Sequence, residues 1–457
     1  MPFLPTAAYS IHLEVALDNV PNTLGRLATA IGEASANIMS MGGFDVRGDL
    51  LVNDVVVNCR DEDHAAAVVA AVEGLSGVQL LDWYDRTFHM HEGGKIGVVS
   101  LAEVNDRHDL SMAYTPGVAR VCMAIHEDPA RSHDLTIRKN TVAVVTDGTA
   151  VLGLGDIGPA AAMPVMEGKA LLFKEFAGVD AFPICLDVND PQEIIDTVIR
   201  IAPTFGGINL EDIAAPAAFE VEEALREALD IPVFHDDQHG TAVVVLAALW
   251  NSCRLTGRQI GDLSVVIAGM GAAGVAVGRI LLDAGVGSIV GVDRSGAVYS
   301  GRDNLNPAKA WFAEHTNPER KMGTLAEVLV GTDVFIGLSG PGLIDAANLR
   351  TMNPEPEIRP EEADGLAAVM ATGRSDYPNQ INNVLAFPGI FRGALDVGAM
   401  DITENMKLAA ARAIAESVSD ADLTSAFVVP SVFDKLVPYR VAEAVAAAAV
   451  ADGVCRA

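Results

Sequence analysis

The stretch "LSVVIAGMGAAGVAVGRILLDAG" (residues 263–285) combines an apolar run of strand length, a glycine-rich turn and the start of a helical pattern. Gly269, Gly271 and Gly274 fit the pattern G-x-G-x-x-G, in which bare glycine backbone lets a pyrophosphate approach the N-terminus of the helix. Asp293 ends the next apolar run, "SIVGVD", about 20 residues further on, where such folds place an acid that accepts hydrogen bonds from a ribose. This stretch therefore predicts a Rossmann-type lobe that binds a dinucleotide. The residues expected at the cofactor are Gly269, Met270, Gly271, Ala272, Ala273, Gly274 and Asp293.

Asp293 also bears on which dinucleotide is bound. A carboxylate repels a 2'-phosphate, so Asp293 favours NAD over NADP. Arg294 follows it directly and could offset that repulsion in part, which leaves NADP open. A second glycine-rich turn, "GLGDIG" (residues 153–158), matches the same pattern, but no acid ends a strand at the required interval after it. We interpret this second turn as one that lines a cleft.

Strands and helices alternate through most of the chain. From residue 92 on, short apolar runs such as "TVAVVTDGT", "AFPICLDV" and "INLEDIAAP" are separated by helical patterns, which is typical of α/β lobes. Residues 9–88 follow the order βαββαβ, the ferredoxin-like arrangement. We predict an α/β protein with a ferredoxin-like N-terminal domain and a two-lobed α/β body with a cleft between its lobes. The predicted ranges are 1–88 for the N-terminal domain, 92–235 for the first lobe, and 236–457 for the dinucleotide-binding lobe with C-terminal helices.

The composition argues against several classes of protein. Half of the 457 residues are apolar, which suffices for two or three cores. The formal net charge of -30 argues against binding to a nucleic-acid backbone, which needs clustered Lys and Arg. No run reaches the roughly 20 apolar residues of a membrane span, and the start of the chain lacks a signal-peptide pattern. The five cysteines are far apart and form no CxxC pair, so we expect a reducing compartment, the cytoplasm.

Carboxylates follow two apolar runs of the first lobe. Glu211 and Asp212 come at the end of one predicted strand, and Asp237 follows the apolar stretch "IPVF". Carboxyl ends of neighbouring strands converge on one cleft in open α/β sheets, so these side chains should lie close together. Three carboxylate ligands with positions left for water and substrate suit Mg²⁺ or Mn²⁺. The apolar setting strengthens this prediction, because unpaired carboxylates are costly to bury.

The stretch "VFHDDQHGTA" (residues 233–242) offers a second interpretation. His235 and His239 are four residues apart, a spacing that holds zinc when both side chains lie on one helix face. The stretch is better interpreted as a strand end followed by a helix start, so the two histidines need not share a face. Magnesium or manganese is therefore favoured over zinc. We expect the neighbouring Asp236 to orient the site rather than to bind the ion.

Two proton carriers stand out in the first lobe. Tyr114 precedes a Thr-Pro-Gly turn in "DLSMAYTPGVARVC", which would fix the direction of its side chain. Lys169 lies in "MPVMEGKALLFKEFAG", at the expected start of a mostly apolar helix. A lone tyrosine is usually a core residue and a lone lysine is usually on the surface, so neither residue indicates catalysis by itself.

Six motifs together resemble the malic enzymes, particularly their compact bacterial type, in the family's order from about residue 92 to the C-terminus. The motifs are "SMAYTPGVA", "PVMEGKALLFKEFAG", "NLEDIAAPAAFEVE", "FHDDQHGTA", "IAGMGAAGVAVGRIL" and "ATGRSDYPNQINNVLAFPGIFRGALDV". The resemblance implies oxidative decarboxylation of L-malate to pyruvate and CO₂ with reduction of NAD. It also implies a homodimer or homotetramer.

The same resemblance implies a role for each matching residue. Glu211, Asp212 and Asp237 match the metal ligands, Lys169 the general base and Tyr114 the general acid, while Asn383 matches a position near the substrate. The base would take the hydroxyl proton of malate as hydride passes to the nicotinamide, and the acid would protonate C3 of the enolpyruvate. Such a lysine has to be neutral, and we expect burial beside a cation to lower its pKa.

The N-terminal region resembles a different family. The order of elements in residues 9–88, with "DNVPNTLG" at the first strand-to-helix turn, is similar to an ACT domain. ACT domains are small regulatory modules that often pair with themselves and bind amino acids at the interface. The resemblance implies regulation, and it leaves open whether an amino-acid effector binds here.

Two positions depart from the malic enzyme pattern. Larger members carry an arginine that grips a malate carboxylate just before the "LGLGD" motif, and Ala150 stands there in this chain. Family members also run an apolar strand directly into the Asn-Pro of "NPEPEI", whereas only "LRTM" precedes Asn353 here, so about one strand is expected to be missing. That strand would carry Asn353 to the nicotinamide end of the cofactor lobe. Either the loss is real and hydride transfer is impaired, or the chain is truncated relative to its natural form.

Two other functions therefore stay open. One is malolactic decarboxylation of malate to lactate at the same site. The other is an amino-acid-sensing protein with an impaired catalytic lobe.

Overall fold

The computed structural model describes residues 5–151, 153–340, 342–352, 367–374 and 377–456. The chain divides into two compact units, Met1–Val98 and Val99–Ala457. No helix among the described residues is both long and apolar enough to cross a membrane.

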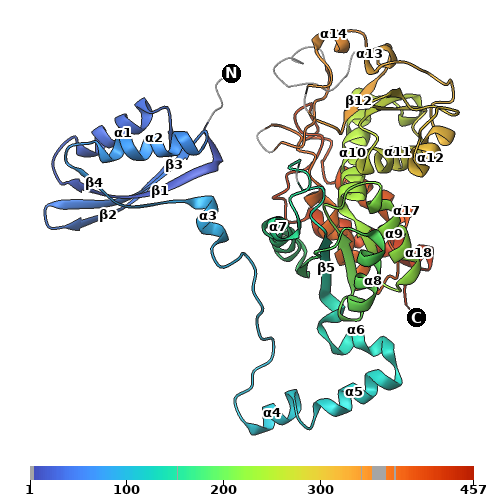
Figure 1. Cartoon of the computed structure of the whole chain (residues 1–457), viewed down its shortest axis with the longest axis horizontal. Helices are drawn as coiled ribbons and strands as arrows, with labels where there is room; N and C mark the ends of the chain where they lie inside the picture. Colours follow the sequence, from blue (N-terminus) through green and yellow to red (C-terminus); the bar gives the residue numbers. More distant parts are fainter. Residues whose placement is uncertain (1–4, 152, 341, 353–366, 375–376, 457) are drawn as a thin grey trace. The chain divides into compact units, whose positions relative to one another are not determined.

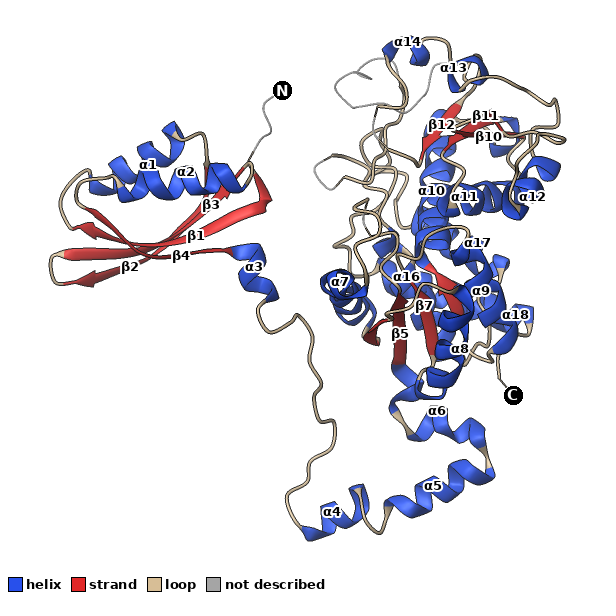
Figure 2. Cartoon of the chain, viewed as in Figure 1, coloured by secondary structure: helices blue, strands red, loops and turns tan. Residues whose placement is uncertain are grey.

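The first unit is a four-stranded antiparallel sheet with two helices on one face (Figure 2). Its strand order, β2-β3-β1-β4, is the ferredoxin-like order that the element sequence βαββαβ predicts. The core forms between that face and the helices, where alternate residues of β1 such as Ile11, Leu13 and Val15 pack against Leu27 and Ile31 of α1. The elements are β1 (Thr6–Asp18), α1 (Thr23–Glu33), β2 (Asn37–Arg47), β3 (Leu50–Cys59), α2 (Glu62–Glu73), β4 (Val78–Asp85) and a short α3 (Arg86–His91).

The second unit contains two mainly parallel sheets, one in each lobe (Figure 1). The first lobe has the strand order β6-β5-β7-β8, and its central strand β5, "TVAVVT", is buried along its whole length, as β-branched strands covered on both faces are. Its elements are β5 (Thr141–Thr146), α7 (Pro159–Ala177), β6 (Asp180–Cys185), α8 (Pro191–Ile201), β7 (Gly207–Leu210), α9 (Ala217–Ala228) and β8 (Val233–His235). Before it lie α4 (Arg107–Ala113), α5 (Val118–Glu127) and α6 (Ser132–Leu135).

The second lobe has the order β11-β10-β9-β12, with β9, β10 and β12 parallel. The glycine-rich turn follows β9, as predicted, so the Rossmann-type arrangement is confirmed. Among the described residues, no strand pairs with the outer edge of β12. The elements are α10 (Asp236–Thr256), β9 (Ser264–Ala268), α11 (Ala272–Asp283), β10 (Ser288–Asp293), β11 (Gly296–Ala297), α12 (Pro307–His315), α13 (Leu325–Val328), β12 (Val334–Gly337) and α14 (Ala346–Leu349).

The C-terminal helices return to the first lobe. Phe387 and Phe391 of α16 place their rings edge-on against Phe173 of α7, with centroid distances of 4.7 and 5.4 Å. Helix α10 leaves the end of β8 in the first lobe and continues to the second lobe (Figure 1). The helices are α16 (Phe387–Asp396), α17 (Glu404–Glu416) and α18 (Val437–Asp452).

Candidate active site

The carboxyl ends of β7 and β8 carry four acidic residues. Glu211 and Asp212 follow β7 directly, and Asp236 and Asp237 are the first two residues of α10, directly after β8. The two strands are parallel neighbours, so their ends lie side by side, as the sequence predicts. The chain turns sharply after β7, since Asp212 has a left-handed backbone (φ 54°), which aspartate tolerates better than most residues.

Three of these carboxylates form a group that could hold a metal ion. One oxygen from each of Glu211, Asp212 and Asp237 lies within 4.8 Å of the others. The backbone N–H of Asp212 donates to Asp237 Oδ2 at 2.8 Å, which ties the two strand ends together. Burial raises the pKa of Glu211 well above its usual range, and the neighbouring carboxylates raise it further against the opposing charge of Lys169. An all-oxygen set under mutual repulsion fits a hard divalent cation such as Mg²⁺ or Mn²⁺.

Lys169 contacts this group, but its position within its helix differs from the prediction. It sits in the middle of α7 rather than at the start of a helix, and it is buried. Its Nζ is 2.9 Å from Glu211 Oε1, 2.5 Å from Asp236 Oδ2 and 4.3 Å from the centroid of the Phe387 ring.

Burial and the neighbouring carboxylates act on the pKa of Lys169 in opposite directions. Burial lowers this pKa, but Asp236, Glu211 and Asp237 raise it, and the net direction is upward. The predicted lowering depends on a cation that offsets these carboxylate charges, so it stays a prediction.

Asp236 connects Lys169 to a distant part of the chain. Its carboxylate is fully buried, and its Oδ2 accepts a hydrogen bond of 2.5 Å from Asn383 Nδ2 as well as the bond from Lys169. Asn383 begins a short 3₁₀ helix just before α16. The structure thus brings Asn383 to the carboxylate cluster, and it places Asp236 beside the lysine rather than in the metal group.

The two histidines of this region point to other partners. His239 Nε2 lies 2.9 Å from Glu222 Oε1, and its Nδ1 lies 3.2 Å from Lys407 Nζ. His235 is fully buried, with its Nδ1 3.9 Å from Asp237 Oδ2. Among the described residues, the three carboxylates are the only group of His, Cys, Asp or Glu side chains close enough together to hold a metal ion. Sequence reasoning missed Glu222 and Lys407, and no local pattern marks them.

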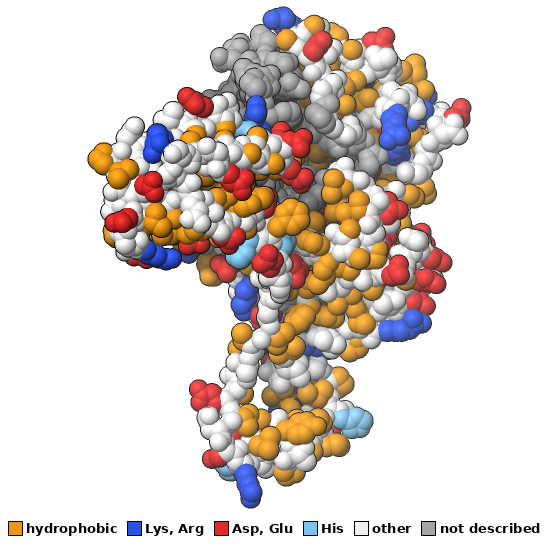
Figure 3. Space-filling view, turned by 60° about the vertical axis from the view of Figure 1, so that its left-hand side comes forward, with side chains coloured by type: hydrophobic (Ala, Val, Ile, Leu, Met, Phe, Trp, Pro, Cys, Tyr) orange, Lys and Arg blue, Asp and Glu red, His pale blue; other side chains and the backbone are white. Residues whose placement is uncertain are grey.

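Tyr114 does not join the cluster within one chain. It caps the C-terminus of α4, and its side chain is 69% exposed. Helices α4 and α5 bury none of their residues. Hydrophobic side chains gather on the surface of this segment (Figure 3), where Leu110, Met112 and Met123 are exposed.

The predicted cofactor turn is packed so closely that two of its positions accept only glycine. Gly269 has φ 106°, and a Cβ on it would come within 2.9 Å of Ser339. A Cβ on Gly274 would come within 2.0 Å of the Gly269 carbonyl oxygen. Gly271 caps α11, and Ala272 and Ala273 form its first turn, so their N–H groups face the turn. Met270 is buried beneath the turn.

Asp293 ends β10 as predicted, but it is paired with two cations. Its Oδ2 accepts from Arg302 Nη2 at 2.6 Å and from Lys309 Nζ at 2.7 Å. Burial raises the pKa of Asp293, and hydrogen bonds from Arg302, Lys309 and the Ser295 backbone lower it to about 2. Arg294, which the sequence suggested as the compensating cation, is exposed. Arg302 and Lys309 therefore balance the charge of Asp293.

Ala150 and Asn353 are the two positions at which the sequence departs from the malic enzyme pattern. The backbone N–H of Ala150 donates to the Asp212 carbonyl at 3.0 Å, so Ala150 borders the carboxylate group without contributing a charge. Asn353 lies outside the described residues.

Comparison with known proteins identifies the family. A model of the malic enzyme N-terminal domain matches residues 93–226, and a model of the malic enzyme NAD binding domain matches residues 238–361 and 365–450. The chain is 53% identical to the NAD-dependent malic enzyme of Geobacillus stearothermophilus, covering 98% of this chain and 96% of that protein. It is also 53% identical to the bifunctional malic/malolactic enzyme of Bacillus subtilis, covering 81% of this chain and 94% of that protein. The crystal structure of malic enzyme from Pyrococcus horikoshii superposes with a TM-score of 0.78 at 46% identity, covering 81% of this chain and 91% of that one. The resemblance found in the sequence is thus confirmed, and the chain belongs to the malic enzyme family.

Proposed function

We propose that this chain is an NAD-dependent malic enzyme that oxidises L-malate and releases CO₂ to form pyruvate. The observation that carries the proposal is the contact of buried Lys169 with Glu211 and Asp236, directly beside the three clustered carboxylates. The 53% identity to an NAD-dependent malic enzyme over nearly the whole chain supports the same activity.

The proposed roles follow from this geometry. Glu211, Asp212 and Asp237 would hold a divalent cation, which would supply Lewis-acid chemistry to the bound malate. Lys169 lies on the Glu211 side of this group and accepts the hydroxyl proton. Burial favours the neutral amine of Lys169, whereas the charges of Asp236, Glu211 and Asp237 raise its pKa. A cation held by Glu211 and Asp237 would offset their part of this rise. Asn383 holds Asp236 in place and so fixes the lysine.

The glycine-rich turn before α11 is the proposed site of the NAD pyrophosphate. Glycine at positions 269 and 274 allows the tight turn, because a Cβ there would collide with Ser339 or with the Gly269 carbonyl oxygen. The N-terminus of α11 favours an anion. Asp293 is placed at the end of β10 to accept hydrogen bonds from the adenosine ribose. NADP remains an alternative substrate, because Arg302 and Lys309 surround that carboxylate.

A steady-state assay tests this proposal. Purified chain with L-malate and Mn²⁺ should form NADH, measured by absorbance, and pyruvate in equal amounts. NADP should support a slower reaction. A chain that forms no reduced cofactor would contradict the proposal.

Tyr114 is proposed as the general acid of a neighbouring copy in a homodimer or homotetramer. Its exposure and the uncovered apolar side chains of α4 and α5 support packing of this segment on a second copy. Mixing experiments distinguish a tyrosine that serves a neighbouring copy from one that acts within its own chain. Lys169→Ala and Tyr114→Phe chains, each nearly inactive alone, should regain activity when unfolded together and refolded, since one site of each mixed dimer then has both residues. If tyrosine acts within its own chain, the mixture stays inactive.

The first unit is proposed as an ACT-type regulatory domain. Its ferredoxin-like strand order supports this, and large apolar side chains on β2 and β4, including Met39, Val46 and Trp83, are exposed and available for pairing. The domain is expected to bind an amino acid. Activity measured against each of the common amino acids tests this, and a flat response to all of them would contradict it.

Malolactic decarboxylation is the second candidate, favoured by the identity to the bifunctional malic/malolactic enzyme. Lactate formation without net NADH would indicate this reaction. Weak formation of either product would favour an impaired catalytic lobe, since no strand among the described residues pairs with the outer edge of β12.

A further inference from the structure

Asn209 is a buried polar residue outside the proposed metal, cofactor and proton-transfer groups. It lies in β7 between Ile208 and Leu210, and it is fully buried. Ile208 and Leu210 pack in the apolar core with residues of α8 and α9, so the side chain of Asn209 points to the opposite face of the sheet. Asparagine is disfavoured inside strands, so local preference does not explain its presence here.

The side-chain amide of Asn209 has one hydrogen-bond partner among the described residues, the carboxylate of Glu211. Its Nδ2 donates to Glu211 Oε2 at 2.9 Å. Its Oδ1 is buried and has no partner within the described part of the chain. A buried polar atom without a partner costs free energy, and an apolar side chain at this position would avoid that cost. Such departures from local preference are expected at functional sites.

Two donors from different elements hold the Glu211 carboxylate. Lys169 Nζ of α7 lies 2.9 Å from Oε1, and Asn209 Nδ2 of β7 binds Oε2. With one donor at each oxygen, the carboxylate cannot rotate without losing a bond. Asn209 is itself held firmly, because β7 pairs with β5 on one side and with β8 on the other.

Asp237 is held in a different way. Its Oδ2 accepts a hydrogen bond of 2.8 Å from the backbone N–H of Asp212, so its position depends on the main chain after β7. Within the carboxylate group, the contact of Asn209 is therefore with Glu211.

We propose that Asn209 is a positioning residue that holds the Glu211 carboxylate in the orientation that binds the divalent cation. This inference rests on the proposed metal site and adds to it a residue that does not touch the ion. Residues that hydrogen-bond a metal ligand typically contribute a factor of roughly 10 to 100 in metal affinity. Without Nδ2, the carboxylate samples several orientations, and the cation binds only a fraction of them.

Isothermal titration of the full chain with Mn²⁺, without malate or NAD, tests this role. Asn209→Leu keeps the approximate size of the side chain and removes the amide, and Asn209→Val does so with a residue that strands favour. Each folded variant should bind Mn²⁺ at least about tenfold more weakly than the unsubstituted chain. Unchanged Mn²⁺ affinity in a folded variant would overturn the proposal. A lack of Mn²⁺ binding by the unsubstituted chain would instead refute the metal site itself.

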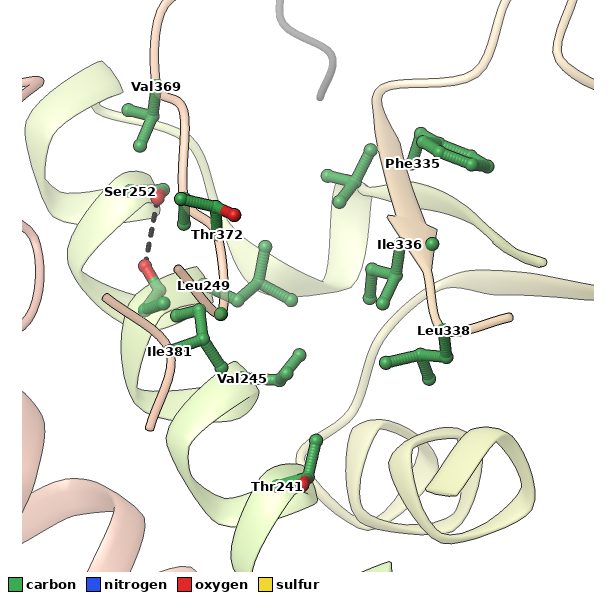
Figure 4. Close-up of a pocket in the computed structure, with 15 residues that line it drawn as sticks. Thr241, Val245, Leu249, Ser252, Phe335, Ile336, Leu338, Val369, Thr372 and Ile381 are labelled. Carbon is green, nitrogen blue, oxygen red and sulfur yellow. Dashed lines mark hydrogen bonds between the residues drawn. The ribbon is translucent and has the colours of Figure 1, made fainter. Parts of the chain in front are cut away.

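Asn251→Leu is the matched control for the loss of a buried amide. Asn251 is fully buried, and its Nδ2 donates to two backbone carbonyls at 2.9 and 2.8 Å. It lies 14 positions after Asp237 in α10, roughly 21 Å along the helix. There the neighbouring Ser252 lines an apolar cavity between α10 and β12 (Figure 4). Asn251→Leu should lower the stability in urea and leave the Mn²⁺ affinity unchanged. An equal loss of Mn²⁺ affinity in Asn209→Leu and Asn251→Leu would overturn the proposal, because destabilisation alone would then explain both.

A double substitution distinguishes an effect through Glu211 from any other effect. In a chain that already carries Glu211→Ala, Asn209 has no carboxylate to hold. Asn209→Leu should then change the remaining weak Mn²⁺ affinity by less than about twofold, measured from the spin resonance signal of free Mn²⁺. A tenfold loss that persists without Glu211 would overturn the proposal.

Discussion

Replacing Asp293 by serine should shift the cofactor preference of this chain from NAD towards NADP. In the structure, this carboxylate accepts bonds from Arg302 at 2.6 Å and Lys309 at 2.7 Å. Serine removes the negative charge that repels a 2'-phosphate and releases both cations. Arg302 should stay in position, because it also donates to the carbonyl oxygens of Gly296 at 3.0 Å and Ala297 at 2.9 Å.

The size of the shift follows from the bonds exchanged. A hydrogen bond to a charged group contributes roughly 1.5 to 3 kcal/mol, and roughly 1.4 kcal/mol corresponds to a factor of ten. NADP gains at least one such bond to Arg302 or Lys309, and NAD loses its ribose bond to Asp293. The ratio of kcat/KM for NADP to that for NAD should therefore rise by roughly 100-fold or more.

The assay measures initial rates with each cofactor at saturating malate and Mn²⁺. Asp303→Ser is the matched control, since Asp303 is exposed and directly follows Arg302. It should leave the ratio unchanged. If Asp293→Ser also leaves the ratio unchanged, Arg302 and Lys309 do not reach the 2' position, and the assignment of Asp293 to the ribose is wrong.

Three further substitutions probe other parts of the chain. Burial would raise the pKa of Glu222, but the charge and hydrogen bond of His239 lower it to about 2 from the ordinary 4.5. The charged carboxylate therefore stabilises the fold fully above pH 4.5, and this stabilisation decreases as the pH falls towards 2. Glu222→Gln should thus lower the free energy of unfolding in urea by roughly 3 kcal/mol at pH 6 and by much less at pH 3; an equal loss at both pH values would argue against the charge. Gly274→Ala places a methyl group 2.0 Å from the Gly269 carbonyl oxygen and should weaken NAD binding at least tenfold, measured by titration, with metal binding unchanged. Asp237→Asn should raise the Mn²⁺ concentration needed for half-maximal activity at least tenfold, and an unchanged Mn²⁺ requirement would exclude it as a ligand.

Much of the site could be predicted because its residues directly follow strands that the sequence marks clearly. Glu211, Asp212 and Asp237 follow short buried strands, and parallel neighbours bring the residues after them to one edge of the sheet. The cofactor turn could be predicted equally well, because the local backbone requires its glycines and they lie within one short stretch. In both cases the signal is local, within a few residues of the side chain that matters.

The rest depends on contacts between distant segments. Lys169 meets Asp236 from 67 positions away, and Asn383 meets it from 147 positions away, so no local pattern gives the charge that surrounds the lysine. The same holds for Arg302 and Lys309 at Asp293. Tyr114 illustrates the opposite case, because its local motif is clear but the residue is exposed rather than packed at the carboxylates.

Asn383 and Phe387 are translated long after the first lobe, to which they contribute contacts. The first lobe spans β5 to β8, yet the contacts that surround Lys169 are completed only by the 3₁₀ helix before α16 and by α16 itself. When translation has passed β8, the first lobe therefore still lacks the later residues that complete the surroundings of Lys169. Nascent chains should stay open to proteases at α7 until residues near 391 have left the ribosome, and folding of the body should then proceed as one late step.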